Sequence, residues 1–321
     1  MKPPHYLSRL LLSIIAAALF ACSATPEEKP LPESLDSPAR LLDQGISEYN
    51  ADNYAAAIRQ FEKALLQYRS IDNQTGIANS CLNLANTYMA INQNQLAAEY
   101  LLRANTVIQG ASLTELNEHL SLLSSSLAIK NGMYGQALLG LEQATESQDT
   151  TIQLAALKNR TSIAFLRNDN DKIQWLEKYK TTQKQEPANP SHAARILRFE
   201  AEASDSKDKS VALLAKSLHI SQQLANRTAI AATLTQWATL DKEENRYNDA
   251  EDKYLRALFI RHQLGDVRSS LSILEQLYAI YAAINDDKAA ITKNWINRLT
   301  ANDLTEWDAL YADFDMYPQP D

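Results

Sequence analysis

The side chains that could support acid–base, metal or nucleophilic chemistry are few and scattered in this chain. Four histidines lie beyond the first twenty residues: His119, His192, His219 and His262. None belongs to the closely spaced set of His, Cys and carboxylate residues that a zinc site or an activated nucleophile requires. The seven glycines form no phosphate-binding loop either. We therefore expect no enzyme activity, no metal site and no cofactor.

Amide side chains offer a different chemistry, because each carries both hydrogen-bond donors and an acceptor. Asn79, Asn83 and Asn86 have the spacing i, i+4 and i+7, which places them on one face of a helix. Further amides recur at the position of Asn83 in later segments: Asn159, Gln236 and Gln276. Such a ladder could hold the backbone of an extended peptide. The alternative is that these are ordinary polar residues on a solvated surface.

One cysteine lies where covalent modification is expected. An apolar run from Leu10 to Phe20 follows a basic N-terminus and is followed by Ala21 and Cys22. The run is too short for a membrane span and is typical of a signal peptide. Its end, Leu-Phe-Ala-Cys, resembles the lipobox of bacterial lipoproteins, whose cysteine receives acyl chains such as palmitate after cleavage. The resemblance implies a signal peptide at 1–21 and a lipid anchor on Cys22. A plain signal peptide with an incidental cysteine is the alternative.

In lipoproteins of that kind an Asp after the cysteine retains the protein at the inner membrane, and this chain has Ser23. The resemblance thus implies the outer membrane, with the protein facing the periplasm. Without residues 1–21 the chain keeps 29 of its 31 basic residues against 39 acidic ones, a net charge of −10. Such a surface repels nucleic acid. The second cysteine, Cys81, is expected to be a small buried apolar residue.

The elements that carry these side chains repeat. An Ala, then an aromatic residue or Leu four residues later, then an Ala three further, recur with a forty-residue step. The clear copies are Ala57/Phe61/Ala64, Ala97/Leu101/Ala104, Ala137/Leu141/Ala144 and Ala250/Tyr254/Ala257. A period in this range indicates an array of supersecondary units. In the first unit, two apolar stripes with helical period lie on either side of a turn at 50–53, which predicts a helical hairpin. The two helices are expected to approach closely at Gly45 and Ala57, because these side chains are small.

This pattern resembles the tetratricopeptide repeat (TPR). The second copy supplies Cys81, Leu84, Ala85, Tyr88, Ala97, Leu101 and Ala104, and the sixth supplies Leu234, Trp237, Ala238, Tyr247, Ala250, Tyr254 and Ala257. The resemblance implies an all-α solenoid of about seven hairpins with a C-terminal capping helix. The units start near Pro38, Ala78, Glu118, Leu154, Ser191, Ala231 and Leu271. The step exceeds the thirty-four residues usual in the family, so longer helices are expected.

Prolines divide the chain into blocks. We expect a Pro-rich flexible linker at 22–37, four repeats at 38–186, and three repeats plus the cap at 187–321. The fourth unit departs from the pattern, with Ile173, Glu177 and Lys180 where Ala, an aromatic residue and Ala are expected. After the seventh unit, apolar residues around Trp307 predict a helix that covers the end of the array. An exposed docking helix is the alternative.

In the TPR family the first helix of each hairpin lines a concave groove, so the resemblance puts the amide ladder there. Apolar residues near the same face could anchor a partner: Leu82, Met89, Leu122, Ile129 and Phe165. Two functions follow. The first is a non-catalytic outer-membrane adaptor that holds envelope proteins or peptides in its groove to assemble or regulate an envelope complex. The second is a sensor that binds a small ligand or peptide and changes shape.

Overall fold

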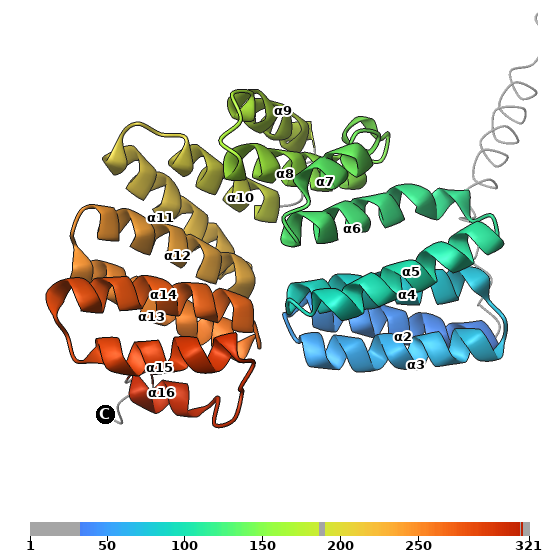
Figure 1. Cartoon of the computed structure of the whole chain (residues 1–321). Coiled ribbons are helices and arrows are strands. Elements are labelled where there is room, and N and C mark those ends of the chain that lie inside the picture. The colour runs from blue at the N-terminus through green and yellow to red at the C-terminus, as the bar shows by residue number, and fades with distance from the viewer. Residues whose placement is uncertain (1–32, 186–189, 315, 317–321) are drawn as a thin grey trace, which may run out of the picture. The chain divides into compact units, whose positions relative to one another are not determined.

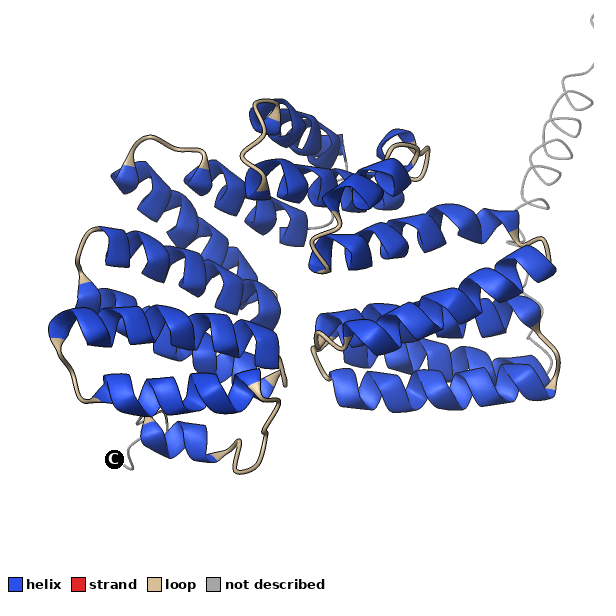
Figure 2. Cartoon of the chain, viewed as in Figure 1, coloured by secondary structure: helices blue, strands red, loops and turns tan. Residues whose placement is uncertain are grey.

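The computed structural model describes residues 33–185, 190–314 and 316. All regular structure in these residues is helical, with fifteen α-helices, two short 3₁₀ helices and no strand (Figure 2). The expected all-α class is therefore confirmed. The expected signal peptide, Cys22, and the Pro187 segment between the two expected blocks lie outside the described residues.

The helices pack as antiparallel neighbours in chain order (Figure 1). The seven pairs are α2 (Glu33–Asn50) with α3 (Tyr54–Ser70), α4 (Gln74–Ala90) with α5 (Asn94–Gly110), α6 (Asn117–Lys130) with α7 (Tyr134–Leu141), α8 (Thr150–Leu166) with α9 (Lys172–Gln185), α10 (Pro190–Glu202) with α11 (Lys207–Gln223), α12 (Arg227–Glu243) with α13 (Tyr247–Gln263), and α14 (Val267–Ile284) with α15 (Lys288–Thr300). The 3₁₀ helices are η1 (Thr114–Leu116) and η2 (Ala144–Glu146), and α16 (Ala309–Asp313) ends the series. The arrangement is that of a helical solenoid.

The described residues from Ser37 onward form one compact unit. Helix α2 begins at Glu33, inside the segment expected to be linker, and Pro38 lies within it. Pro38 is the sixth residue of α2, beyond the first four N–H groups that lack an intrahelical acceptor, so its missing N–H removes one hydrogen bond from the helix. At the other proline boundary, Pro190 occupies the first position of α10.

Turn geometry explains the forty-residue step. Helices α3, α4 and α5 have 17 residues each, and three-residue turns separate them. The middle residue of each turn adopts positive φ, with 52° at Asp72 and 59° at Asn92. Asp and Asn tolerate this left-handed conformation better than other residues with a Cβ. One helix and one turn therefore occupy twenty residues, and a hairpin occupies forty.

The repeated small and aromatic positions form the core. Ala57 and Ala64 are fully buried and Phe61 is 1% exposed. A Cβ placed at Gly45 would collide with the Phe61 ring. The close helix approach expected at Gly45 is therefore present, since only glycine leaves space for that ring.

The fourth hairpin has a different register from the one expected. Ile173 is 45% exposed, and Lys180 forms an ion pair with Glu177 at 2.9 Å. Tyr179 and Thr182 are buried instead, two residues further along α9. Glu177 and Lys180 keep their charges solvated, whereas the large Tyr179 ring gains more from burial, so the buried positions lie two residues later.

The first helices of the hairpins form a continuous inner layer. Each first helix from α4 to α14 contacts the first helix of the next hairpin, in the order α4, α6, α8, α10, α12 and α14. Four of the apolar residues expected to anchor a partner on this layer are instead buried in hydrophobic clusters: Leu82, Met89, Leu122 and Phe165. That expectation was wrong, because these side chains pack between hairpins rather than facing the groove.

The C-terminal segment covers the last hairpin. Leu310 is fully buried and Phe314 is 3% exposed, both in the cluster formed by α12 to α15. Trp307 is half-buried and stacks on the His262 ring, with the two centroids 4.7 Å apart. The segment thus acts as a cap, although its helix α16 has only five residues.

Candidate functional site

Three amides of the predicted ladder connect successive first helices. Each hydrogen-bonds to the first helix of the preceding hairpin: Asn159 Nδ2 to Ser126 Oγ at 2.7 Å, Gln236 Nε2 to the Arg198 carbonyl at 3.0 Å, and Gln276 Oε1 from Lys242 Nζ at 2.5 Å. These amides therefore stabilise the inner layer. A peptide would have to compete for them or use their remaining hydrogen-bonding capacity.

Asn79, Asn83 and Asn86 lie on α4 and are all partly exposed. Asn83 Nδ2 donates to the Asn79 backbone carbonyl at 3.0 Å, and Asn86 interacts with the Tyr49 hydroxyl. The structure therefore brings these three together on one helix, and it brings none of them into contact with Asn159, Gln236 or Gln276. Their binding of a peptide stays a prediction.

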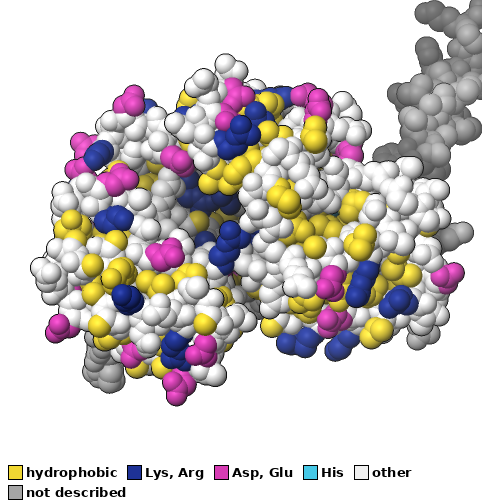
Figure 3. Space-filling model, viewed as in Figure 1, with side chains coloured by type: hydrophobic (Ala, Val, Ile, Leu, Met, Phe, Trp, Pro, Cys, Tyr) yellow, Lys and Arg dark blue, Asp and Glu magenta, His cyan; other side chains and the backbone are white. Residues whose placement is uncertain are grey.

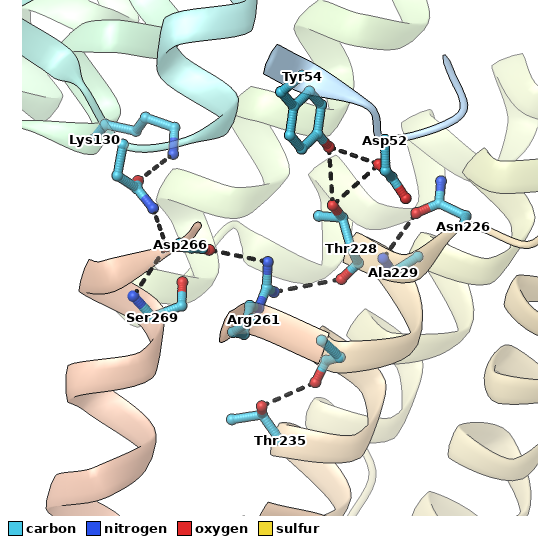
Figure 4. A network of polar contacts seen from close by, with 12 residues as sticks. Asp52, Tyr54, Lys130, Asn226, Thr228, Ala229, Thr235, Arg261, Asp266 and Ser269 are labelled. Atoms are coloured by element: carbon cyan, nitrogen blue, oxygen red, sulfur yellow. Dashed lines mark hydrogen bonds and ion pairs between the residues drawn. The ribbon is translucent and has the colours of Figure 1, made fainter. Parts of the chain in front are cut away.

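The first hairpin also touches the sixth. Asp52 accepts hydrogen bonds from the Tyr54 hydroxyl at 2.6 Å and from the Arg227 backbone N–H at 2.9 Å, and Arg227 Nε is 3.8 Å from the same carboxylate. The Tyr54 hydroxyl is also 3.1 Å from Thr228 Oγ1 (Figure 4). We call these contacts the seam, together with the contacts that Asn92 and Lys130 make with α14.

The second part of the seam joins the second and third hairpins to the seventh. Asn92 in the α4–α5 turn hydrogen-bonds to Asp266, the N-cap of α14, and accepts from Lys130 Nζ at 2.8 Å. Arg268 donates to the Lys130 carbonyl at 2.8 Å. The hydrophobic clusters of the described residues stay on one side or the other. Polar contacts therefore hold the early hairpins against the late ones.

A cavity of ≈ 340 Å³ lies beside the seam, within the inner layer. Its side chains come from the first hairpin, from α8, α9 and α10, and from the start of α12: Tyr49, Asn50, Asp52, Tyr54, Lys158, Tyr179, Ser191, His192, Arg195, Arg198, Asn226, Thr228 and Ala229. We call it the inner cavity. Figure 3 shows Lys and Arg side chains in the hollow near the centre of the viewed face. The volume of the inner cavity is within the range of small-molecule pockets.

The charges of the inner cavity are not balanced. Lys158, Arg195 and Arg198 face one acid, Asp52, which Tyr54 and the opposite side of the seam already engage. Arg198 donates to the Ala229 carbonyl at 3.0 Å, a neutral acceptor. The ammonium of Lys158 and the guanidinium of Arg195 have no hydrogen bond or ion pair to any described residue. The lining carries a net charge of +2 in a chain whose net charge is −8.

Burial and mutual repulsion shift the titration of these groups. Desolvation, followed by the charges of Arg195 and Lys130, lowers the pKa of Lys158 to about 8. Desolvation, followed by Lys158 and Arg195, lowers the pKa of His192 to about 4, so this imidazole is neutral at pH 7. Burial raises the pKa of Tyr179, whose hydroxyl is 2.5 Å from His192 Nδ1. The cavity is thus cationic at neutral pH.

A larger hollow of ≈ 800 Å³ opens on the other side of Asp52 and Tyr54, towards Trp307. Its charged residues are two bases, Arg59 and Arg227, and two acids, Asp52 and Asp308. The charges balance, and Arg227 is paired with Asp52. It therefore offers less to a charged ligand than the inner cavity does, despite its greater volume.

Other candidate groups give no second site. Within the described ranges, no three His, Cys, Asp or Glu side chains are placed to hold a metal ion, and no helix is long and apolar enough to cross a membrane. Cys81 is 2% exposed, as expected, and burial raises its pKa to about 11, so the thiol is unreactive at neutral pH.

Lys158 and Arg195 were not among the site residues predicted from the sequence. Counted from the unit starts at Leu154 and Ser191, both are the fifth residue of their repeat, immediately before the position of the amide ladder. Two cations at one position of adjacent hairpins were the available signal. The chain matches no protein-family model and no curated protein.

Proposed function

We propose that this chain is a non-catalytic binding scaffold of the TPR type, tethered to the outer membrane, that holds an envelope protein or peptide on its inner layer. The observation that carries the proposal is the continuous layer of first helices, which presents polar side chains to the half-open inner cavity. Arrays of helical hairpins use such inner surfaces for binding. The TPR assignment rests on the buried Ala and aromatic positions of the repeat.

The tether is tested by replacing Cys22 with Ser. If the cysteine carries acyl chains, this variant should leave the outer-membrane fraction in a salt wash, because the acyl chains provide the membrane affinity. Cys81→Ser is the matched control and should stay with the membrane, since Cys81 is buried in the hairpin core. A Cys22→Ser protein that still fractionates with outer membranes would show that the anchor is something else.

The binding surface is tested by a triple variant on α4. Replacing Asn79, Asn83 and Asn86 with Ala should abolish partner recovery in a mild-detergent pull-down and leave the melting temperature nearly unchanged. A control with Gln95 and Asn105 replaced by Ala changes exposed amides on the outer helix α5 and should recover the partner normally. Equal recovery by the triple variant and wild type would remove these asparagines from the site.

The seam favours a second candidate, a sensor that changes shape when a ligand or peptide binds. Polar contacts in water are individually weak, with a net contribution of about 0.5–1.5 kcal/mol per hydrogen bond. A modest ligand preference for one state could therefore open or close the seam. Solution scattering with and without envelope extract separates the two functions, since the sensor predicts a clear change in radius of gyration and the adaptor predicts little.

A further inference from the structure

The inner cavity holds more positive charge than its own residues neutralise. Buried cations in proteins are normally paired, because removing an ammonium or guanidinium from water is costly. Lys158 on α8 and Arg195 on α10 are both partly exposed to the cavity, and no described residue pairs with either. The arrangement lowers the stability of the empty protein at neutral pH, and an anion from outside would relieve it.

The donors in the cavity are suited to an oxyanion. A lysine ammonium has three N–H donors, and an arginine guanidinium presents a planar fork that matches the oxygens of a carboxylate or phosphate. The side chains of Lys158 and Arg195 spend none of these donors on other described residues. Tyr49, Tyr54 and Tyr179 add aromatic walls to the same cavity.

The balance of charge sets the valence of the ligand. With three cations, one carboxylate and a neutral His192, the lining is complementary to a charge of −2. The volume of ≈ 340 Å³ suits a compact molecule rather than a long peptide.

We propose that the inner cavity binds a small organic dianion, of the phosphate monoester or dicarboxylate class, through Lys158 and Arg195. This rests on the second candidate function, the sensor, and names the chemistry of the small ligand that the sensor would bind. A dianion brings the charge of the lining close to zero. It also connects α8 with α10, next to the seam, so occupancy stabilises the closed arrangement of the hairpins.

Isothermal titration calorimetry of the full chain at pH 7 tests the proposal. The probes are inorganic phosphate, sn-glycerol 3-phosphate and succinate, with glycerol as the neutral control. We expect at least one dianion to bind and glycerol not to bind. Tighter binding of glycerol phosphate than of succinate assigns the phosphate class, and the reverse order assigns the dicarboxylate class.

Two variants locate the binding. Lys158→Met and Arg195→Met should each weaken the dianion by at least about tenfold, because each removes a charge-assisted contact. Lys216→Gln removes one positive charge from an exposed position on α11 outside the cavity and should bind within about twofold of wild type, which controls for net charge.

Thermal unfolding gives a readout that a merely structural role would not produce. Without ligand, Lys158→Met should melt at or above the wild-type temperature. At about 100 times the wild-type dissociation constant, ligand should raise the wild-type melting temperature by about 5 °C and that of this variant by at most about half as much.

The proposal is overturned if no dianion binds wild type, or if both methionine variants bind it as tightly as wild type does. Partner recovery in the pull-down keeps the two proposals separate. Recovery without dianion binding would refute the ligand class and leave the scaffold function in place.

Discussion

Replacing Asp52 with Asn should loosen the seam without disturbing the turn that carries it. Asp52 has a φ of 58°, and Asn accepts this left-handed conformation at least as well as Asp does. The substitution therefore removes the negative charge and one acceptor while the backbone and side-chain shape stay the same. Any loss of stability then reports the contacts between the first hairpin and α12.

The magnitude follows from two short hydrogen bonds and one ion pair of the carboxylate; the Thr228 hydroxyl, 3.4 Å away, adds little. The Tyr54 hydroxyl and the Arg227 N–H donate to the carboxylate at 2.6 and 2.9 Å, and the Arg227 guanidinium lies 3.8 Å away. Hydrogen bonds to charged groups contribute about 1.5–3 kcal/mol and neutral ones about 0.5–1.5. Asn keeps the bond with Tyr54 at a cost of about 1 kcal/mol and loses the bond with the Arg227 N–H at a cost of about 1.5–3 kcal/mol. The ion pair adds less than about 1 kcal/mol, because the Arg227 side chain is one-third exposed. We expect a loss of about 3–4 kcal/mol.

Urea unfolding and amide hydrogen exchange measure this loss. The unfolding midpoint should fall, and exchange should accelerate in the segment 224–230, where the Arg227 N–H loses its acceptor. Asp72→Asn is the matched control, since Asp72 has a φ of 52° in the next turn and its exposed carboxylate bonds only to Gln74. It should change stability by less than about 0.5 kcal/mol.

Equal losses in the Asp52 and Asp72 variants would refute the reasoning, because the seam would then contribute nothing beyond an ordinary turn. Unchanged exchange in 224–230 would be equally damaging. It would mean that the first and sixth hairpins are not held together in solution.

Three further predictions concern packing and pH. Gly45→Ala should lower the free energy of unfolding by about 1–3 kcal/mol, because its new methyl group meets the Phe61 ring. Gly135→Ala has open space around the new Cβ and should raise the free energy of unfolding by up to about 1 kcal/mol. Thermal unfolding midpoints test both variants. His192 should contribute a loss of stability of at most about 3 kcal/mol as the pH drops from 6.5 towards 4, because the unfolded state protonates this residue first. Denaturant unfolding of His192→Gln should therefore show a shallower slope, and the remaining slope includes His119 and His262, whose pKa values burial also lowers. Lys158→Met should be more stable than wild type by about 1–3 kcal/mol at pH 7. This gain in stability should shrink as the pH rises from 8 to 10.5, because wild-type Lys158 becomes neutral first in the folded state and later in the unfolded state. An unchanged gain at pH 10.5 in urea unfolding would contradict that account.

Local sequence patterns were sufficient for the hairpins. Ala57, Phe61 and Ala64 specify a buried helix face by their spacing alone, and the Asp52 turn is readable from its residue types. The fourth hairpin was misplaced by two residues because its composition is ambiguous. Only the packing of α9 against its neighbours decides that Tyr179 rather than Ile173 is buried.

The amide ladder illustrates a different limit. The sequence placed Asn159 and Gln236 at one position of successive repeats, and the structure keeps that equivalence. Their hydrogen bonds to the preceding hairpin could not be predicted, because the curvature of the array determines which neighbouring groups come within reach. An amide's capacity to bond does not identify its partner.

The sequence by itself determined the helical class, the number of hairpins and the length of each step, because these depend on interactions between residues close in the chain. Tertiary structure alone decided that Asp52 meets Arg227, 175 positions away, and that Lys158 and Arg195 share a cavity without an acid to pair with them. Contacts of that range depend on the small rotation between successive hairpins, summed over the whole array. No local pattern encodes that sum, and the charge of the inner cavity follows from it.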